Sequence, residues 1–269
     1  MGIKLGNLDI SSFKVGSVDC TIYLGETLVF EPTQPTPSLK FSASYSDGTS
    51  YSEECDGDST LTSATTKPSG YEASGMTSAV VGNCVTSINN KAFQRCTSLS
   101  SVTIPSSVTN IGSYAFSNCS SVINIEIPSG ITNINGNTFY NCKSLTSITI
   151  PSSVTSIGMS SFAGCTSLSS VTIPSSVTSI GGQAFANCSG LTNCIIGSGV
   201  TSIGIWGFQN CTSLSSIIIE STTPPTLELN AFQNTNNCPI YVPAASVDAF
   251  KSASGWSDYT SRLQAIPNS

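Results

Sequence analysis

A 23-residue period runs through the middle of this 269-residue chain and constrains its fold more than any other feature. Each copy places the same apolar residue types at the same offsets, with no slip over more than 120 residues. The clearest columns hold a phenylalanine and, three residues later, a cysteine: Phe93, Phe116, Phe139, Phe162, Phe185 and Phe208, with Cys96, Cys119, Cys142, Cys165, Cys188 and Cys211. A fixed period of about 20 to 50 residues predicts a solenoid or array, because one such unit cannot bury its own apolar face.

The interior of one repeat can be inferred from residues 145–151. Ile148 and Ile150 alternate with small hydroxyl residues, which is the period of a strand with one buried face. Pro151 ends this strand, because proline has no N–H to donate to a ladder. Phe162 is expected to fill the space between the strand and the opposite wall of the repeat.

The cysteine column is predicted to be a row of reduced, buried thiols, since a free cysteine usually behaves as a small apolar residue. Cys194 supports this, because it occupies a position that is valine or isoleucine in the other repeats. Metal or disulfide chemistry in the column is the less favoured alternative. The redox state of four further cysteines stays open: Cys20, Cys55, Cys84 and Cys238.

The repeat resembles the BspA-like, treponemal-type leucine-rich repeat, whose pattern is L-x-x-I-x-I-P-x-x-V-x-x-I-G-x-x-A-F-x-x-C. The match extends from about Val81 to Ile219. The resemblance implies a curved solenoid with parallel strands on its concave side, often located on bacterial surfaces and used in adhesion. It carries over no catalytic residues.

The sequence therefore predicts a β-rich leucine-rich-repeat solenoid between two dissimilar ends. We divide the chain into a β anchor or assembly module (1–31), a proline-rich linker (32–38), an N-terminal cap (39–80), the repeats (81–237) and a C-terminal cap (238–269). The N-terminal cap is expected to contain a hairpin around Asp47-Gly48. The C-terminal cap is expected to combine a strand at 240–243, a helix start at 246–251 and a further turn to Ile266.

The first 31 residues do not share the repeat. Segments 4–9, 14–19 and 23–28 echo one another and predict three short strands, too few residues for a stable isolated sheet. The module should therefore need a partner, either a virion protein or its own copies. Residues 22–30 resemble the opening segments of virion proteins in phages of gut bacteria. The apolar residues assigned to assembly are Leu5, Val15, Ile22, Leu24, Val29 and Phe30.

Composition argues against several functional classes. The chain has no histidine, so a Ser-His or Cys-His nucleophile pair is excluded. Glu126 and Glu220 lie four repeats apart and form no close carboxylate pair, and we expect no enzyme and no cofactor. A net charge of −6 with scattered Lys and Arg argues against nucleic acid as a partner.

Membrane and metal sites are not expected either. No apolar run is long enough to span a membrane, and residues 1–7 lack the apolar core of a secretion signal, unless a leader has been removed. Four acidic residues around Gly57 lack EF-hand spacing, so a solvated acidic loop is favoured over a calcium site: Glu53, Glu54, Asp56 and Asp58.

The leading hypothesis is a non-enzymatic, virion-associated fibre or decoration protein, anchored by residues 1–31 and attaching to a host surface protein or glycan. The alternatives are a bacterial cell-surface adhesin and a purely structural virion decoration with no ligand; a homo-oligomer is compatible with each.

Two ligand-binding surfaces are predicted. The first, the strand face, comprises Ser101, Thr103, Asn124, Glu126, Ser147, Thr149, Ser170, Thr172, Asn193, Ile195, Ser216 and Ile218. The second, the variable edge, comprises Lys91, Arg95, Tyr114, Tyr140, Met159, Gln183, Ile205 and Trp206. Exposed Tyr, Met and Trp favour the edge as an interface, whereas Ser and Thr also serve simply to keep a strand solvated.

Overall fold

The computed structural model describes residues 3–5, 8–10, 22–24, 27–30, 39–55, 58–62, 66, 70 and 72–267. The chain divides into two compact units, residues 1–38 and 39–269, and each is described separately.

The first unit contains a four-stranded sheet in the order β1-β2-β3-β4. Its strands are β1 (Ile3–Leu5), β2 (Leu8–Ile10), β3 (Ile22–Leu24) and β4 (Thr27–Phe30), and neighbours pair antiparallel. The prediction of three strands was wrong. Segments 4–9 and 23–28 are each divided by a Gly-containing pair, Gly6-Asn7 and Gly25-Glu26, which is the composition of a two-residue hairpin connection. Segment 14–19 lies outside the described residues.

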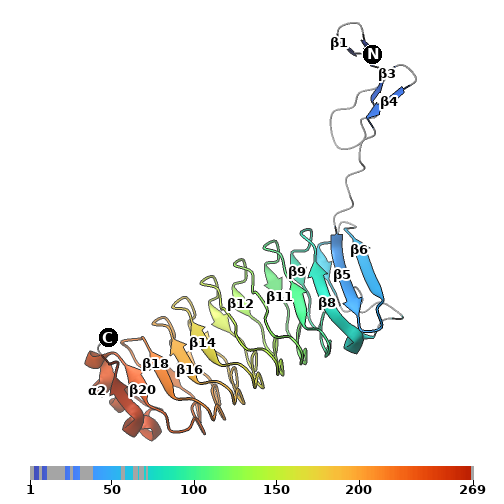
Figure 1. The fold of residues 1–269 in the computed structure, drawn as a ribbon. Coiled ribbons are helices and arrows are strands. Elements are labelled where there is room, and N and C mark those ends of the chain that lie inside the picture. The colour runs from blue at the N-terminus through green and yellow to red at the C-terminus, as the bar shows by residue number, and fades with distance from the viewer. Residues whose placement is uncertain are drawn as a thin grey trace. The chain divides into compact units, whose positions relative to one another are not determined.

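The second unit begins with a hairpin that covers the first repeat (Figure 1). Strand β5 (Leu39–Tyr45) pairs antiparallel with β6 (Ser50–Glu54) on one side and with β8 (Met76–Val81) on the other. Strand β7 (Thr60–Leu61) and the short 3-10 helix η1 (Ala73–Gly75) complete this end. The expected hairpin at Asp47-Gly48 is confirmed.

The repeats then stack as successive rungs with two walls of parallel strands. Neighbouring strands are 23 residues apart in register, as in the pairing of Ser170 with Asn193 and of Asn193 with Ser216. One wall contains β10 (Ser101–Thr103), β14 (Ser170–Ile173), β16 (Asn193–Ile196) and β18 (Ser216–Ile219). The other contains β9 (Ser87–Ile88), β11 (Asn110–Ile111), β12 (Asn133–Ile134), β13 (Ser156–Ile157), β15 (Ser179–Ile180), β17 (Ser202–Ile203) and β19 (Thr226–Leu227). The predicted solenoid of 23-residue repeats is confirmed.

Between the two walls, the phenylalanine column forms a stack of buried, nearly parallel rings. Consecutive ring centroids lie 5.0 Å apart at Phe93–Phe116 and 5.1 Å apart at Phe162–Phe185. Beside the stack runs a third, unbroken ladder, in which each Phe N–H donates to the carbonyl of the next rung; for Phe162 and Ala184 the distance is 2.8 Å. The repeat therefore has three walls, and the Phe wall is the most continuous of them.

The cysteine column lies against this wall, and all six of its cysteines are buried, reduced thiols, as predicted. The structure adds a role that the sequence argument missed. The Sγ of Cys119, Cys142, Cys165, Cys188 and Cys211 each donates to the carbonyl oxygen of the phenylalanine 26 residues earlier, at 3.0 to 3.3 Å. The thiols thus satisfy buried carbonyls as well as filling space.

Two backbone positions in every rung adopt positive φ, which turns the chain sharply around the phenylalanine. The second of these positions is usually asparagine, with φ of 61° at Asn118 and 60° at Asn187, and Asn tolerates this region well. The asparagines also form a ladder, since Asn141 Nδ2 donates to Asn118 Oδ1 and Asn210 Nδ2 donates to Asn187 Oδ1. The first position is more varied and holds Lys91, Tyr114, Asn137, Ser160, Gln183, Trp206 and Asn230.

The C-terminal end closes the stack with aromatic residues. Strand β20 (Ile240–Val242) is followed by η2 (Ala244–Ser246), α2 (Val247–Ser252), η3 (Ser257–Arg262) and β21 (Leu263–Ala265). Trp256 covers Phe232, the last ring of the stack, and its Nε1 donates to Pro225 O at 2.9 Å. Buried Arg262 donates from Nε to Cys238 O and from Nη2 to Thr235 Oγ1. The predicted C-terminal strand and helix are confirmed; the parallel pairing of β21 with β20 was not foreseen.

The strand expected in the middle rungs is a further prediction that was wrong. Residues 147–150 were expected to form a strand, but neither they nor residues 124–127 are in one. Their isoleucines still point inward, and Ile148 and Ile150 are buried, so the alternation was correct. They are not strands because their backbone groups make no hydrogen bond to the rung on either side.

Candidate functional site

The strand face is a solvent-exposed surface made of two outward columns. Where the sheet is continuous, one column runs Ser170–Asn193–Ser216 and the other runs Thr172–Ile195–Ile218. All twelve of its residues are exposed or half-buried. The second column continues to Tyr241 and then Gln264, which the sequence argument missed. Tyr241 could have been found from the strand register, because Tyr241 pairs with Ile218, the last residue of the predicted face.

In the middle of this face the sheet is interrupted. It is continuous up to β10 and from β14 onward, but residues 124–127 and 147–150, all described, make no backbone hydrogen bond to a neighbouring rung. The opposite strand wall also breaks here, between β11 and β12, where Asn135 Nδ2 replaces the missing backbone donor to Ile111 O. The rings of Phe116 and Phe139 are 5.7 Å apart, the widest spacing in the phenylalanine stack.

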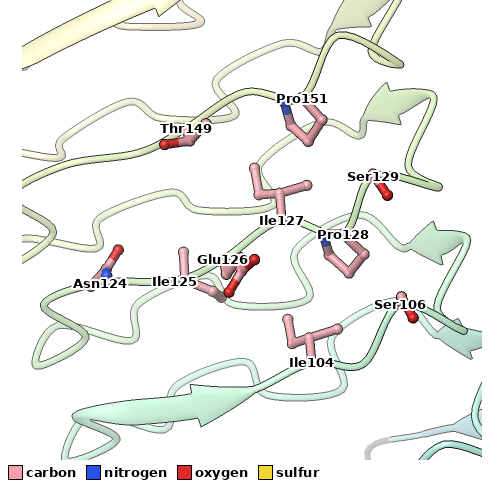
Figure 2. Close-up of a pocket in the computed structure, with 10 residues that line it drawn as sticks. All are labelled: Ile104, Ser106, Asn124, Ile125, Glu126, Ile127, Pro128, Ser129, Thr149 and Pro151. Atoms are coloured by element: carbon pink, nitrogen blue, oxygen red, sulfur yellow. The ribbon is translucent and has the colours of Figure 1, made fainter.

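A hollow of about 540 Å³ lies over this interruption. Figure 2 shows its lining residues on three successive rungs: Ile104, Ser106, Asn124, Ile125, Glu126, Ile127, Pro128, Ser129, Thr149 and Pro151. Glu126 is the only charged residue of the lining, and its side chain is exposed. Three predicted strand-face residues therefore meet at one concave place: Asn124, Glu126 and Thr149.

The variable edge follows the turn beside the phenylalanine column. Lys91, Tyr114, Gln183 and Trp206 occupy the first left-handed position of their rungs, and Met159 and Ile205 immediately precede it. Lys91, Arg95, Tyr114, Tyr140 and Met159 are exposed; Gln183, Ile205 and Trp206 are half-buried. Met159 is 62% exposed, and Leu229, omitted from the predicted edge, is 66% exposed. Leu229 was missed because the register slips by one residue before Phe232.

Strained backbone coincides with these bulky side chains. Tyr114 and Trp206 have φ of 60° and 56°, a region in which such residues are uncommon. Lys91 Nζ lies 6.0 Å from the centre of the Tyr114 ring, so the two form a cation–π pair across adjacent rungs. At Lys91 and Tyr114 the repeat therefore fixes a left-handed backbone and leaves the side chain exposed.

The acidic residues near Gly57 lie beside a buried cation that the sequence argument missed. Lys40 is 2% exposed, and its Nζ lies 3.3 Å from Glu53 Oε1 and 3.7 Å from Asp58 Oδ2. The expectation of a simply solvated acidic loop was thus wrong for Glu53, which is half-buried against Lys40, whereas Asp58 is 55% exposed; Asp56 lies outside the described residues. A disulfide between Cys55 and Cys84 ties this loop to the first rung.

Of the residues assigned to assembly, Leu5 is on β1, Ile22 and Leu24 are on β3, and Val29 and Phe30 are on β4. Val15 lies outside the described residues. Within the part of the chain that the structure describes, no three His, Cys, Asp or Glu residues are grouped as metal ligands would be. In the same part, no helix has the length and apolarity required to span a bilayer.

A family model for the BspA type leucine-rich repeat region matches residues 66–190 and 132–254, which together span 66–254. Among solved structures, the leucine-rich repeat protein of T. pallidum is 31% identical with a TM-score of 0.57; the alignment covers 61% of this chain and 78% of that one. A leucine-rich repeat protein from Eubacterium ventriosum is 21% identical with a TM-score of 0.54, covering 72% and 50% of the two chains, and shows similarity of fold alone. One from Bacteroides ovatus is 27% identical with a TM-score of 0.49, covering 78% and 55%. No curated protein sequence matches the chain.

Proposed function

Because the chain belongs to the BspA-type leucine-rich repeat family, we propose that it is a non-enzymatic binding protein of a bacterial cell surface, an adhesin whose solenoid contacts a host protein or glycan. The observation that carries this proposal is the repeat itself. Its three walls build a long, regular scaffold, and the strand face and the variable edge present side chains that differ from rung to rung on its outside. Stacked repeats with extended surfaces are a usual design for binding.

The disulfide between Cys55 and Cys84 favours this surface location. Disulfides persist in oxidising compartments outside the cytosol and are rare inside it. A protein that folds and assembles into virions within the host cytoplasm would meet reducing conditions. The virion hypothesis rests on residues 1–31 alone, whereas the family match covers the solenoid and the solved structures described above are of bacterial proteins; the adhesin alternative is therefore preferred here.

Cell fractionation tests the proposal. An antibody against residues 39–269 should label intact, unpermeabilised cells of the producing bacterium, and brief protease treatment of those cells should remove the signal. Detection only in purified phage particles, in fixed stoichiometry with a capsid or tail protein, would instead support the virion hypothesis. Detection only in the cytosolic fraction would reject both.

A further inference from the structure

We propose that the hollow over the interrupted sheet is a binding site for a neutral glycan, with Glu126 as its principal hydrogen-bond acceptor. This inference rests on the proposed binding function and names the ligand class and the place where it binds.

The backbone supplies the first argument. In the rungs beyond the interruption, strand N–H and C=O groups are used up in parallel pairing, as between Val171 and Cys194. Residues 124–127 and 147–150 lack that pairing, so they offer a row of alternating donors and acceptors. Unpaired backbone groups favour a ligand that can itself donate and accept at close intervals. Sugar hydroxyl groups do both.

Between the rungs at 124–127 and 147–150, the narrowness of the gap argues against an inserted peptide strand. Immediately before it, Thr146 N donates to Ile123 O at 3.1 Å, and beyond it Ser153 Oγ donates to Ile131 O at 2.6 Å. The rungs at 124–127 and 147–150 are thus held together on both sides of the opening. An inserted strand would lie about 4.8 Å from each neighbour and would push these two rungs apart, whereas a sugar ring can lie over the opening without entering it.

The side chains supply the second argument. A carboxylate accepts hydrogen bonds on two oxygens, which suits neighbouring hydroxyl groups on one sugar ring, and the Asn124 amide both donates and accepts. Thr149 adds a hydroxyl, while the half-buried Ile104 and Pro151 provide apolar surface for the C–H face of a ring. A concave site with apolar walls and a few convergent polar groups is the usual form of a small-ligand site.

Charge sets the expected selectivity. Since Glu126 is the only charged residue of the lining, the site carries a negative charge with no cation within the lining to offset it. Sialylated or sulfated glycans should be repelled. Neutral glycans are therefore the class that fits.

The experiment uses the full chain on a printed array of neutral, sialylated and sulfated glycans, followed by titration calorimetry with the strongest neutral glycan. We expect binding to neutral glycans and little to acidic ones. Glu126→Gln should weaken that binding at least about tenfold. Glu220→Gln is the matched control, because Glu220 is an exposed acid outside the hollow, and it should bind as the parent does.

A second pair of variants tests the place rather than the charge. Thr149→Trp should fill the hollow and abolish binding, whereas Thr172→Trp, one rung further in the same outward column where the sheet is paired, should not. Circular dichroism verifies that each variant folds. Absence of neutral-glycan binding, or binding that survives both Glu126→Gln and Thr149→Trp, would overturn the inference. Attachment to host surfaces that withstands periodate oxidation of their glycans would reject it while leaving the proposed adhesin function intact.

Discussion

At the scale of single residues, each column of the repeat combines two physical tasks. The cysteines fill space and donate to phenylalanine carbonyls, and the asparagines accept a left-handed backbone and bond to the next rung. Phenylalanine provides the ring stack that separates the walls. These side chains contact or bond to the adjacent rung. Substituting them should therefore lower the free energy of unfolding more than substituting residues of the outward face.

The buried thiols should be unreactive in the native protein. Burial raises the pKa of Cys142 to about 12, so the nucleophilic thiolate is nearly absent at pH 8. An alkylating reagent at pH 8 should leave the six ladder cysteines unmodified, and urea should expose all of them, as read by peptide mass spectrometry. A disulfide between Cys119 and Cys142 would contradict the buried-thiol assignment.

The same burial predicts a loss of stability in alkali. Burial is the main cause of raised pKa values at Cys142, Cys165 and Cys194 in the folded state. In the unfolded chain these thiols ionise near pH 8.5. A folded pKa above the unfolded one means that stability is complete below about pH 8.5 and declines as pH rises toward about 12. Each such thiol contributes a decline of up to about 1.4 kcal/mol per pH unit.

Urea titrations from pH 7 to 10.5 measure the free energy of unfolding at each pH. In Cys142→Ala this free energy should fall less steeply with pH, because one titrating thiol has been removed. A free energy of unfolding that does not change above pH 8.5 would show that the thiols are accessible to solvent in the folded protein.

Inside and outside positions should differ sharply in their effect on stability. Phe162→Ala removes a fully buried ring from the stack and should cost about 3–5 kcal/mol of unfolding free energy. Ser147→Ala alters an exposed hydroxyl and should cost less than about 0.5 kcal/mol. Urea unfolding of the two variants gives the comparison; a larger effect at Ser147 would reverse the assignment of the faces.

At the scale of elements, both ends of the solenoid need structures that the repeat does not provide. The N-terminal end is closed by the antiparallel strand β5, whose Phe41 ring lies 5.9 Å from Phe93, and by the pairing of Lys40 with two carboxylates. The C-terminal end uses Trp256, Tyr259 and Arg262 over Phe232. Terminal repeats need such caps because their apolar faces have no further rung to contact.

The disulfide of the N-terminal cap should stabilise that end in particular. It links residues 29 apart in sequence, so its loss should cost about 3–4 kcal/mol in a chain-entropy account. In the double variant Cys55→Ser/Cys84→Ser, hydrogen exchange should accelerate in residues 39–88 and remain slow in β16 and β18. Equal acceleration along the whole solenoid would show that the cap and the rungs unfold as one unit.

At the scale of the whole molecule, the chain is two units with different requirements. Residues 39–269 have a continuous core that is capped at both ends. Residues 1–38 form a separate unit of short strands, and a single small sheet is marginally stable in water. Assembly through residues 1–31 therefore stays a prediction of its own.

Deleting residues 1–31 should leave the solenoid folded and soluble, with an unchanged melting temperature. The same deletion should abolish assembly, whether with further copies or onto a larger particle. Size-exclusion chromatography with light scattering on the two forms provides the test. If the full-length chain and the shortened chain are both monomeric, residues 1–31 do not mediate self-assembly.

The sequence by itself determined the solenoid, the buried columns and the outward faces, because an unbroken 23-residue period forces equivalent residues into equivalent positions. Short-range signals also located the Asp47-Gly48 hairpin and the C-terminal helix. These features depend on spacing and local turn chemistry, which a single sequence contains in full.

The tertiary structure alone decided how the rungs are placed against one another. Equivalent sequences at 101–104 and 124–127 gave no reason to expect that the second would lose its ladder, because rung separation depends on packing summed over three walls. The Lys40 pairing and the Cys55–Cys84 disulfide join segments that lie outside the period, so no column predicted them. The hollow beside Glu126 follows from that placement: its residues could be read from the sequence, but their meeting at one concave site could not.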